Sequence, residues 1–401
     1  MCENAKTIKS NTVKYILFQM LYGTALTLTT GAVVQAFFEH LGLTGKTSLY
    51  SSVIQIFQVA SMMACSLWCD RLKSIIKSVG RSVCVIGTLS IALILVCLGI
   101  PSDTGDIFFF ILAVSCVSSI GLGIYNVLIY KLPYSIYDIG EFGKYSALCG
   151  IVSGLCGFAC TSLISYLTGV FPYRTVILIF FAVGAVFFAA ATVICFSFKK
   201  IADFPLDEKS DIKLLRLPEF TKLIAPNILR GIGTGIMGLI TVVGIKRGVL
   251  DGETSVHVAT LTVLGSMCGF LFYLATVKTV RIKALTLITA FTVLVSLPLS
   301  VVTENFYFFC VMYFIAYAAV TALGNCIPVL VYGGVPREII GKYTAWRMLF
   351  LTLGSAIPGF FMNLLLDKIG AVAVLATGGV CTAVCGVVYV VVFGKRIKPQ
   401  K

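Results

Sequence analysis

Charge is scarce in this sequence, and carboxylates are missing from the middle of its apolar segments. Only 12% of the 401 residues are charged, about half the share found in an ordinary soluble protein. The 17 acidic residues fall in the termini, in loops or at segment ends, and Glu39 and Asp367 lie near the outer ends of their segments. Proton-coupled exporters of organic cations generally need a carboxylate in a helix centre, so this function is disfavoured.

Motifs for catalysis and for metal binding are also missing. The sequence has no Walker loop, and its two histidines, His40 and His257, stand near no nucleophile in a recognisable motif. Most of the 15 cysteines lie in apolar segments, where a thiol behaves as a small hydrophobic group. Cysteine pairs spaced four apart lack the further ligands that a metal ion needs. We therefore expect no enzyme, no cofactor and no metal site.

Long apolar segments dominate what is present. Hydrophobic residues make up 58% of the chain, and the mean hydropathy is +1.00. Each segment is close to the ~20 residues that a helix needs to cross ~30 Å of hydrocarbon. We expect twelve transmembrane helices at roughly 13–38, 48–68, 82–100, 107–130, 145–167, 174–198, 223–245, 255–277, 283–302, 306–332, 343–366 and 371–394.

One polar stretch, residues 199–222, divides these helices into six before it and six after it. We therefore expect an N-terminal bundle at 1–198, a cytoplasmic loop at 199–222 and a C-terminal bundle with a short tail at 223–401. Of the 31 basic residues, 24 lie on the side of the termini and this loop, and five lie on the other side. The positive-inside rule places that side in the cytoplasm. The net charge of +14 is thus a topology signal, and nucleic acid is rejected as a partner.

The two halves also repeat one another. Three pairs of matching motifs occur in the same order, about 200 residues apart: Gly143–Ala147 with Gly341–Ala345, Lys14 and Leu21–Gly23 with Lys222 and Leu229–Gly231, and Leu122–Gly123 with Leu323–Gly324. Two parallel six-helix repeats around a cytoplasmic loop describe the major facilitator architecture. The expected fold is thus an all-α membrane protein of two pseudo-symmetric bundles, in which Tyr22 and Arg230 occupy equivalent positions.

In helix number, topology and central loop, the whole chain resembles a major facilitator superfamily transporter. The family's signature after its second helix is a Gly, then Asp-Arg/Lys, then Gly-Arg. Here Asp70 and Arg71 match it, Ser66 replaces the first Gly and the later Gly is missing. The resemblance implies a cytoplasmic gating latch made by Asp70 and Arg71. An ordinary pair of charges in a loop is the alternative.

Two arginines fall inside apolar segments. Arg230 lies ~12 Å beyond Lys222 along its helix, and Arg347 lies ~9 Å beyond Gly341. A charge at such depth is costly unless it faces water or a partner, so both are candidates for substrate binding. Extension of the side chain to the cytoplasm, or pairing within the protein, is the alternative. The resemblance places the helix of Arg230 at the central cavity.

Neutral polar side chains form stripes on several other segments. Gln19, Tyr22, Thr27 and Thr30 share one face, Ser115, Ser119 and Asn126 share another, and Tyr317 and Asn325 belong to a third. Amides and hydroxyls in lipid need partners, so these stripes should face inward. Bonding between helices is the alternative role. Besides the two arginines, the candidate substrate-binding residues are Gln19, Tyr22, Gln58, Tyr125, Asn126, Asn227, Tyr317 and Asn325.

These features leave three functions open. The first is a carrier for a small polar or anionic organic solute, which works by alternating access. The second is a carrier for neutral sugars or nucleosides, in which the arginines serve as gates. The third is a membrane receptor or lipid-handling protein that transports nothing. We expect a monomer in a bacterial plasma membrane, with a small solute and the lipid bilayer as its partners and with both termini in the cytoplasm.

Overall fold

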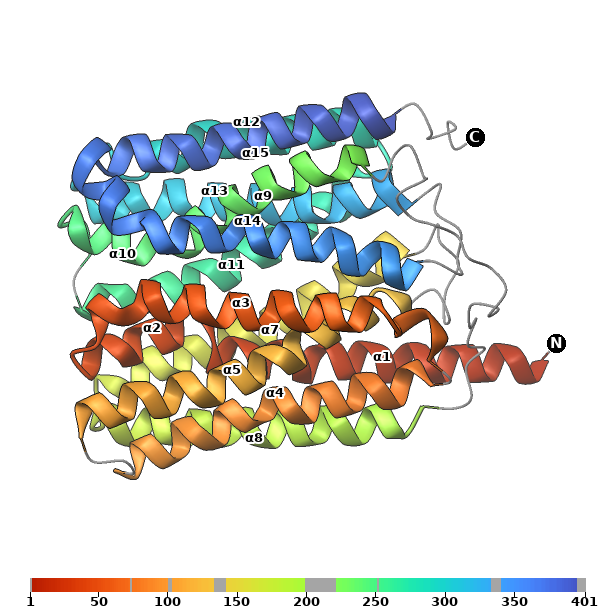
Figure 1. The fold of residues 1–401 in the computed structure, drawn as a ribbon, viewed down its shortest axis with the longest axis horizontal. Coiled ribbons are helices and arrows are strands. Elements are labelled where there is room, and N and C mark those ends of the chain that lie inside the picture. Colours follow the sequence, from red (N-terminus) through yellow and green to blue (C-terminus); the bar gives the residue numbers. More distant parts are fainter. Residues whose placement is uncertain are drawn as a thin grey trace. The chain divides into compact units, whose positions relative to one another are not determined.

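Helices account for almost all of the structure, a computed structural model that describes residues 2–72, 74–99, 103–132, 142–198, 221–250, 252–332 and 340–394 (Figure 1). In the first half the helices are α1 (Cys2–Thr29), α2 (Gly31–His40), α3 (Thr47–Ser66), α4 (Ile75–Cys97), α5 (Thr104–Leu128), α7 (Phe142–Thr168) and α8 (Tyr173–Phe196). In the second half they are α9 (Ile224–Gly238), α10 (Ile240–Lys246), α11 (Gly252–Thr276), α12 (Ile282–Leu299), α13 (Phe306–Tyr332), α14 (Ile340–Ile369) and α15 (Ala371–Phe393).

The helices occupy the twelve segments that the sequence predicts. Within the described ranges, nine helices are long and apolar enough to cross a membrane, or ten if the bent pair α9 and α10 forms one span. Helices α11 and α14 lie at the two remaining predicted positions but are not among these ten. The chain is a multi-pass, all-α membrane protein, and the full count of twelve spans stays a prediction.

The internal contacts divide the chain into two units, residues 1–208 with 337–346 and residues 209–336 with 347–401. In the first unit α1 packs on α7 and α8, α4 packs on α5 and α8, and α3 packs on α5. In the second unit α9 packs on α15, α12 packs on α13 and α15, and α11 packs on α13. Apart from the pair α1 and α7, the second set repeats the first, with α9, α11, α12, α13 and α15 in the places of α1, α3, α4, α5 and α8. Each half therefore folds on the same plan, as the matching motifs predict.

The first helix of each half is interrupted, which the sequence analysis did not predict. Thr30 takes an extended conformation between α1 and α2, and Gly31 has φ of +60°, a left-handed value that glycine adopts without steric cost. In the second half α9 and α10 meet at Leu239 with a bend of 49°. Thr30 and Leu239 differ by one position in the alignment that pairs Lys14 with Lys222. The predicted continuous helices 13–38 and 223–245 are therefore wrong at matching places.

Basic side chains satisfy carbonyl groups at helix ends in the first half. Arg174 at the start of α8 donates hydrogen bonds to the carbonyl oxygens of Val96 and Cys97, in the last turn of α4. Lys14 donates to the carbonyl oxygen of Ser197, the C-cap residue of α8. The last carbonyls of a helix lack partners within it and carry partial negative charge, so cations suit these positions.

Glycines allow close helix packing in the second half. A methyl group on Gly231 of α9 would lie 2.1 Å from the Leu351 carbonyl oxygen of α14, and one on Gly235 would lie 2.5 Å from that of Ser355. A methyl group on Gly238 would meet nothing within 4 Å. The sequence pattern places all three glycines on one packing stripe. Gly231 and Gly235 lie against the α14 backbone, whereas the position of Gly238 leaves room for a side chain.

We expect Gly231→Ala to destabilise the protein, because its methyl group would press against the α14 backbone. Overpacking of this kind costs about 1–3 kcal/mol. Gly238→Ala in the same helix is the control and should fold normally, because its methyl group meets open space. The measurement is the thermal unfolding temperature and folded yield of both variants in detergent. Equal stability of the two variants would contradict the packing shown here.

Candidate functional site

A polar and aromatic cluster forms in the first half around Gln19. The Gln19 amide nitrogen donates to the Tyr15 hydroxyl at 3.1 Å, and the Tyr125 hydroxyl donates to the Gln19 amide oxygen at 3.4 Å. Ser153 of α7 donates to the Gln19 backbone oxygen at 2.8 Å. Three predicted site residues, Gln19, Tyr22 and Tyr125, therefore lie together, on α1 and α5.

Tyr22 stacks within this cluster. Its ring lies 4.2 Å from that of Tyr125, 5.9 Å from that of Phe18 and 6.1 Å from that of Phe188, measured between ring centroids. The side chain is 4% exposed, and its hydroxyl has no hydrogen-bond partner in the described part of the chain. The Tyr22 hydroxyl is thus a polar group inside the first half that has no hydrogen-bond partner among the described residues.

Arg230 lies on α9, the first helix of the second half. A methyl group on Gly324 of α13 would lie 3.3 Å from an Arg230 guanidinium nitrogen, and the helix of Arg230, α9, packs on α15. Tyr22 likewise contacts Tyr125 of α5 and Phe188 of α8, the helices that correspond to α13 and α15. These neighbours support the predicted equivalence of Tyr22 and Arg230, which stays a prediction.

The Arg230 side chain is only partly buried. Among the described residues none makes a hydrogen bond or an ion pair with its guanidinium. The contacts at this residue are those of its backbone oxygen, which accepts a bond from the Thr234 hydroxyl at 3.1 Å. The guanidinium therefore offers five unused donors from the middle of an apolar helix.

Asn227, one turn earlier on α9, is engaged within the protein. It is fully buried, its amide nitrogen donates to the Leu223 carbonyl at 2.8 Å, and its amide oxygen accepts from the Tyr389 hydroxyl at 2.6 Å. The sequence analysis names Asn227 as a candidate ligand for a solute. The structure instead gives it a bond that joins α9 to α15.

Arg347 differs from Arg230 in its surroundings. It is 2% exposed, its guanidinium carbon lies 5.1 Å from the centroid of the Tyr332 ring, and one nitrogen lies 3.8 Å from the Met348 sulfur. An arginine over an aromatic face is attracted by the ring's negative charge density. The printed contacts of Arg347 are thus a ring face and a sulfur of the second half, and its role in solute binding stays a prediction.

The other predicted substrate-binding residues lie on α3, α5 and α13. Gln58 and Asn126 are partly buried on α3 and α5, and Tyr317 packs edge-on against Tyr313 at 5.7 Å. The Asn325 amide is 8% exposed and donates to the Thr321 carbonyl of its own helix. Arg71 is exposed, and the side chain of Asp70 lies outside the described residues, as do residues 199–220 of the predicted loop.

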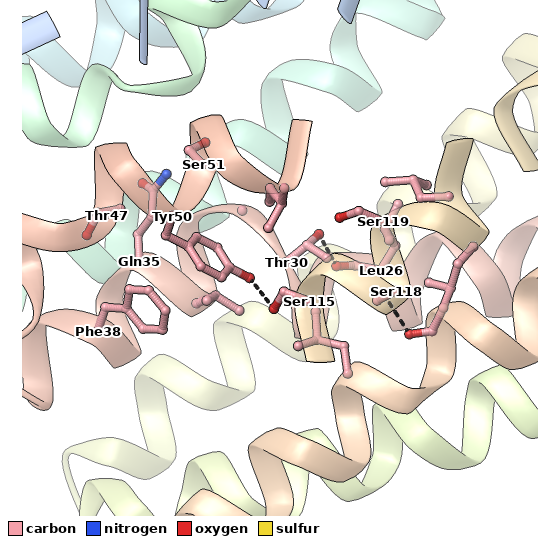
Figure 2. A pocket seen from close by; sticks show the side chains of 16 residues that line it. Leu26, Thr30, Gln35, Phe38, Thr47, Tyr50, Ser51, Ser115, Ser118 and Ser119 are labelled. Atoms are coloured by element: carbon pink, nitrogen blue, oxygen red, sulfur yellow. Dashed lines mark hydrogen bonds between the residues drawn. The ribbon is translucent and has the colours of Figure 1, made fainter. Parts of the chain in front are cut away.

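A cavity of about 160 Å³ opens in the first half beside the break between α1 and α2 (Figure 2). Five helices line it, and its polar groups are Thr30, Gln35, Thr47, Tyr50, Ser51, Ser115, Ser118 and Ser119. Figure 2 shows the Tyr50 hydroxyl reaching from α3 to Ser115 of α5, a hydrogen bond of 2.9 Å. The sequence stripes contain Thr30, Ser115 and Ser119 but missed the rest, because nothing in an apolar segment marks where a helix breaks.

The sequence matches the family model described as Major Facilitator Superfamily over residues 15–359. The chain belongs to this family. Among curated proteins none matches the sequence. Solved structures match it along nearly its whole length, as expected for a transporter with the major facilitator fold, and the fold class predicted from the sequence is confirmed.

Three such structures belong to transporters of very different solutes. A bacterial homologue of the iron transporter ferroportin has a TM-score of 0.74 and 13% identity over 95% of this chain and 98% of its own. The Escherichia coli fucose:proton symporter FucP has a TM-score of 0.69 and 11% identity, over 98% of this chain and 100% of its own. The nucleoside transporter NupG has a TM-score of 0.67 and 12% identity, over 95% of this chain and 99% of its own. At these identities the likeness shows the fold alone, so the solute must be argued from the residues.

The bond between Asn227 and Tyr389 yields a prediction for this major facilitator protein. Tyr389→Phe removes the hydroxyl and leaves the buried Asn227 oxygen without that donor, which should cost about 1–3 kcal/mol of stability. The affinity for the solute, measured as uptake per folded molecule, should not change, because we assign this bond to the packing of α9 on α15 and not to solute binding. Tyr307→Phe, at a tyrosine that is 78% exposed, is the control and should change neither quantity. A lower solute affinity in folded Tyr389→Phe would instead give Asn227 a place in binding.

Proposed function

We propose that this transporter is a carrier for a small polar organic solute with an anionic group, and that Arg230 binds that group. The observation that carries the proposal is the Arg230 guanidinium, which is partly accessible and has no hydrogen bond or ion pair with the described residues. On insertion scales, an arginine at a helix centre costs about 2.5–3.5 kcal/mol. An anionic ligand offsets that cost.

The chemistry of arginine sets the class of solute. A guanidinium presents a planar fork of donors that holds a carboxylate or a phosphate through two parallel hydrogen bonds. Gly324 leaves the space beside the fork open. Arg347 and Asn227 are bound within the second half, so we assign them to its internal structure. The neutral groups that we retain as candidate solute contacts are Gln19, Tyr22, Gln58, Tyr125, Asn126, Tyr317 and Asn325.

Transport by alternating access follows from the family's architecture. We propose that the bundles at 1–198 and 223–401, joined by the loop at 199–222, expose the solute first on one side of the membrane and then on the other. Binding of the anion neutralises the Arg230 charge, and this difference between loaded and empty carrier can bias the exchange. Asp70 and Arg71 stay the proposed cytoplasmic latch. The proposed location is a bacterial plasma membrane with cytoplasmic termini.

The first test compares Arg230→Lys with Arg247→Lys, which alters an exposed arginine of the same half. Lysine keeps the charge but loses the two-bond fork, so Arg230→Lys should lower solute affinity at least tenfold while Arg247→Lys should not. Arg230→Ala should nearly abolish uptake at low solute, because loss of a desolvated charge contact costs about 2–5 kcal/mol. The measurement is uptake into proteoliposomes per folded molecule, over a panel of carboxylates, phosphates, sugars and nucleosides.

Two results would contradict the proposal. Normal affinity in both Arg230→Lys and Arg230→Ala would end the anion hypothesis. Uptake confined to neutral sugars or nucleosides would favour the carrier in which the arginines serve as gates. A purely structural arginine would lower the folded yield and leave the affinity of the surviving protein unchanged.

Gly324→Ala tests the geometry around the guanidinium. The added methyl group would lie 3.3 Å from the Arg230 nitrogen, so the flexible end of the arginine must shift by a few tenths of an ångström. We expect normal folding and a two- to tenfold loss of affinity for an anionic solute. In the Arg230→Lys background the same change should have little effect, because the two substitutions act on one contact. Equal losses in both backgrounds would show that Gly324 acts independently of Arg230.

A further inference from the structure

The cavity beside the break in the first helix has the features of a second ligand site, apart from Arg230. Most of its wall is apolar, eight of the 16 lining residues carry a polar side chain, and none of the 16 is charged. They come from α1, α2, α3, α4 and α5. The cavity therefore belongs to the first half alone, whereas Arg230 lies on α9.

Some of its polar groups are already satisfied. The Tyr50 hydroxyl pairs with Ser115, Ser118 donates to the Ile86 carbonyl at 3.1 Å, and Thr30 donates to the Leu26 carbonyl at 2.6 Å. These bonds fix the walls of the cavity, as the dashed lines in Figure 2 show. A ligand would therefore find a preformed wall.

Other hydroxyls on the wall are unused. Thr47 is 3% exposed and Ser119 is 6% exposed, and neither side chain makes a hydrogen bond within the described ranges. Ser51, also on the wall, has none either. These hydroxyl groups are therefore available to a ligand in the cavity that has matching donors and acceptors. The unused groups come from α3 and α5.

The volume and the lining together define the ligand. A dry apolar cavity of about 150 Å³ accommodates benzene, so about 160 Å³ has room for one six-membered ring. Leu26, Val34, Ile54, Leu89 and Leu122 supply apolar wall for the faces of a ring. The hydroxyls supply donors and acceptors for its edge. A charged ring would lose its hydration without gaining a counter-charge.

We propose that this cavity binds an uncharged, single-ring molecule that carries hydrogen-bonding groups on its edge, at a site independent of Arg230. The break in the helix positions the site. Because Thr30 is extended and Gly31 has φ of +60°, the chain leaves the path of α1, and both residues border the cavity.

Binding to the purified full-length protein tests the proposal. Uracil, phenol and galactose serve as uncharged probes, and benzoate serves as a charged ring of similar size, all measured by calorimetry and thermal shift. At least one uncharged probe should bind, and benzoate should bind at least tenfold more weakly at this site. Ser119→Leu fills the cavity and should lower the affinity for the uncharged probe at least tenfold. Ala113→Leu, at an exposed position of the same helix, should not.

Two further variants complete the test. Arg230→Gln should leave binding of the uncharged probe unchanged, which separates this site from the proposed anion site. Leu89→Ala enlarges the cavity and should admit hypoxanthine, a two-ring uncharged probe that the natural protein should reject, so the test does not depend on the folding of Ser119→Leu. Binding of none of the uncharged probes, full binding in Ser119→Leu, or a loss in Arg230→Gln equal to that in Ser119→Leu would overturn the proposal.

Discussion

A polar group in hydrocarbon has no water to bond with, so it must find its partner inside the protein. This constraint accounts for most of the polar contacts in both halves. Hydroxyls such as those of Thr29 and Thr289 donate to carbonyl groups one turn back on their own helices. The Asn227 amide joins α9 to α15 through Tyr389. Arg347 is enclosed beside the Tyr332 ring.

Against this background, the groups that lack partners carry the functional argument. Within the described residues these include the Arg230 guanidinium and the hydroxyls of Thr47 and Ser119. They differ in chemistry and in place. Arg230 is a cation on α9, whereas the hydroxyls border an uncharged cavity in the first half. The account therefore contains two sites of opposite preference, one for an anionic group and one for an uncharged ring.

The symmetry of the halves sharpens the contrast between Tyr22 and Arg230. Corresponding helices surround both residues, so the plan of the fold makes neither side chain necessary. In the first half the residue is a tyrosine, whose ring stacks on that of Tyr125 with 4.2 Å between the centroids. The second half places a charge at the same point, where Gly324 leaves it room. A feature that departs from the repeat in this way is better explained by binding than by folding.

The sequence predicted the helices and their repeat well, because spans of about 20 apolar residues and matched motifs are properties of the chain itself. It failed to predict the break at Thr30, because a threonine and a glycine also occur in unbroken membrane helices. It could not assign Asn227, whose partner Tyr389 is 162 residues away. Likewise, no pattern shows that Thr47 and Ser119 border one cavity.

The central claim concerns what the Arg230 guanidinium binds, and a structure of the carrier with its transported solute tests it most directly. The account predicts a carboxylate or phosphate of the solute within about 3 Å of the guanidinium nitrogens, as charge-assisted hydrogen bonds require. A solute bound elsewhere, with Arg230 hydrated or paired to a protein group, would contradict it.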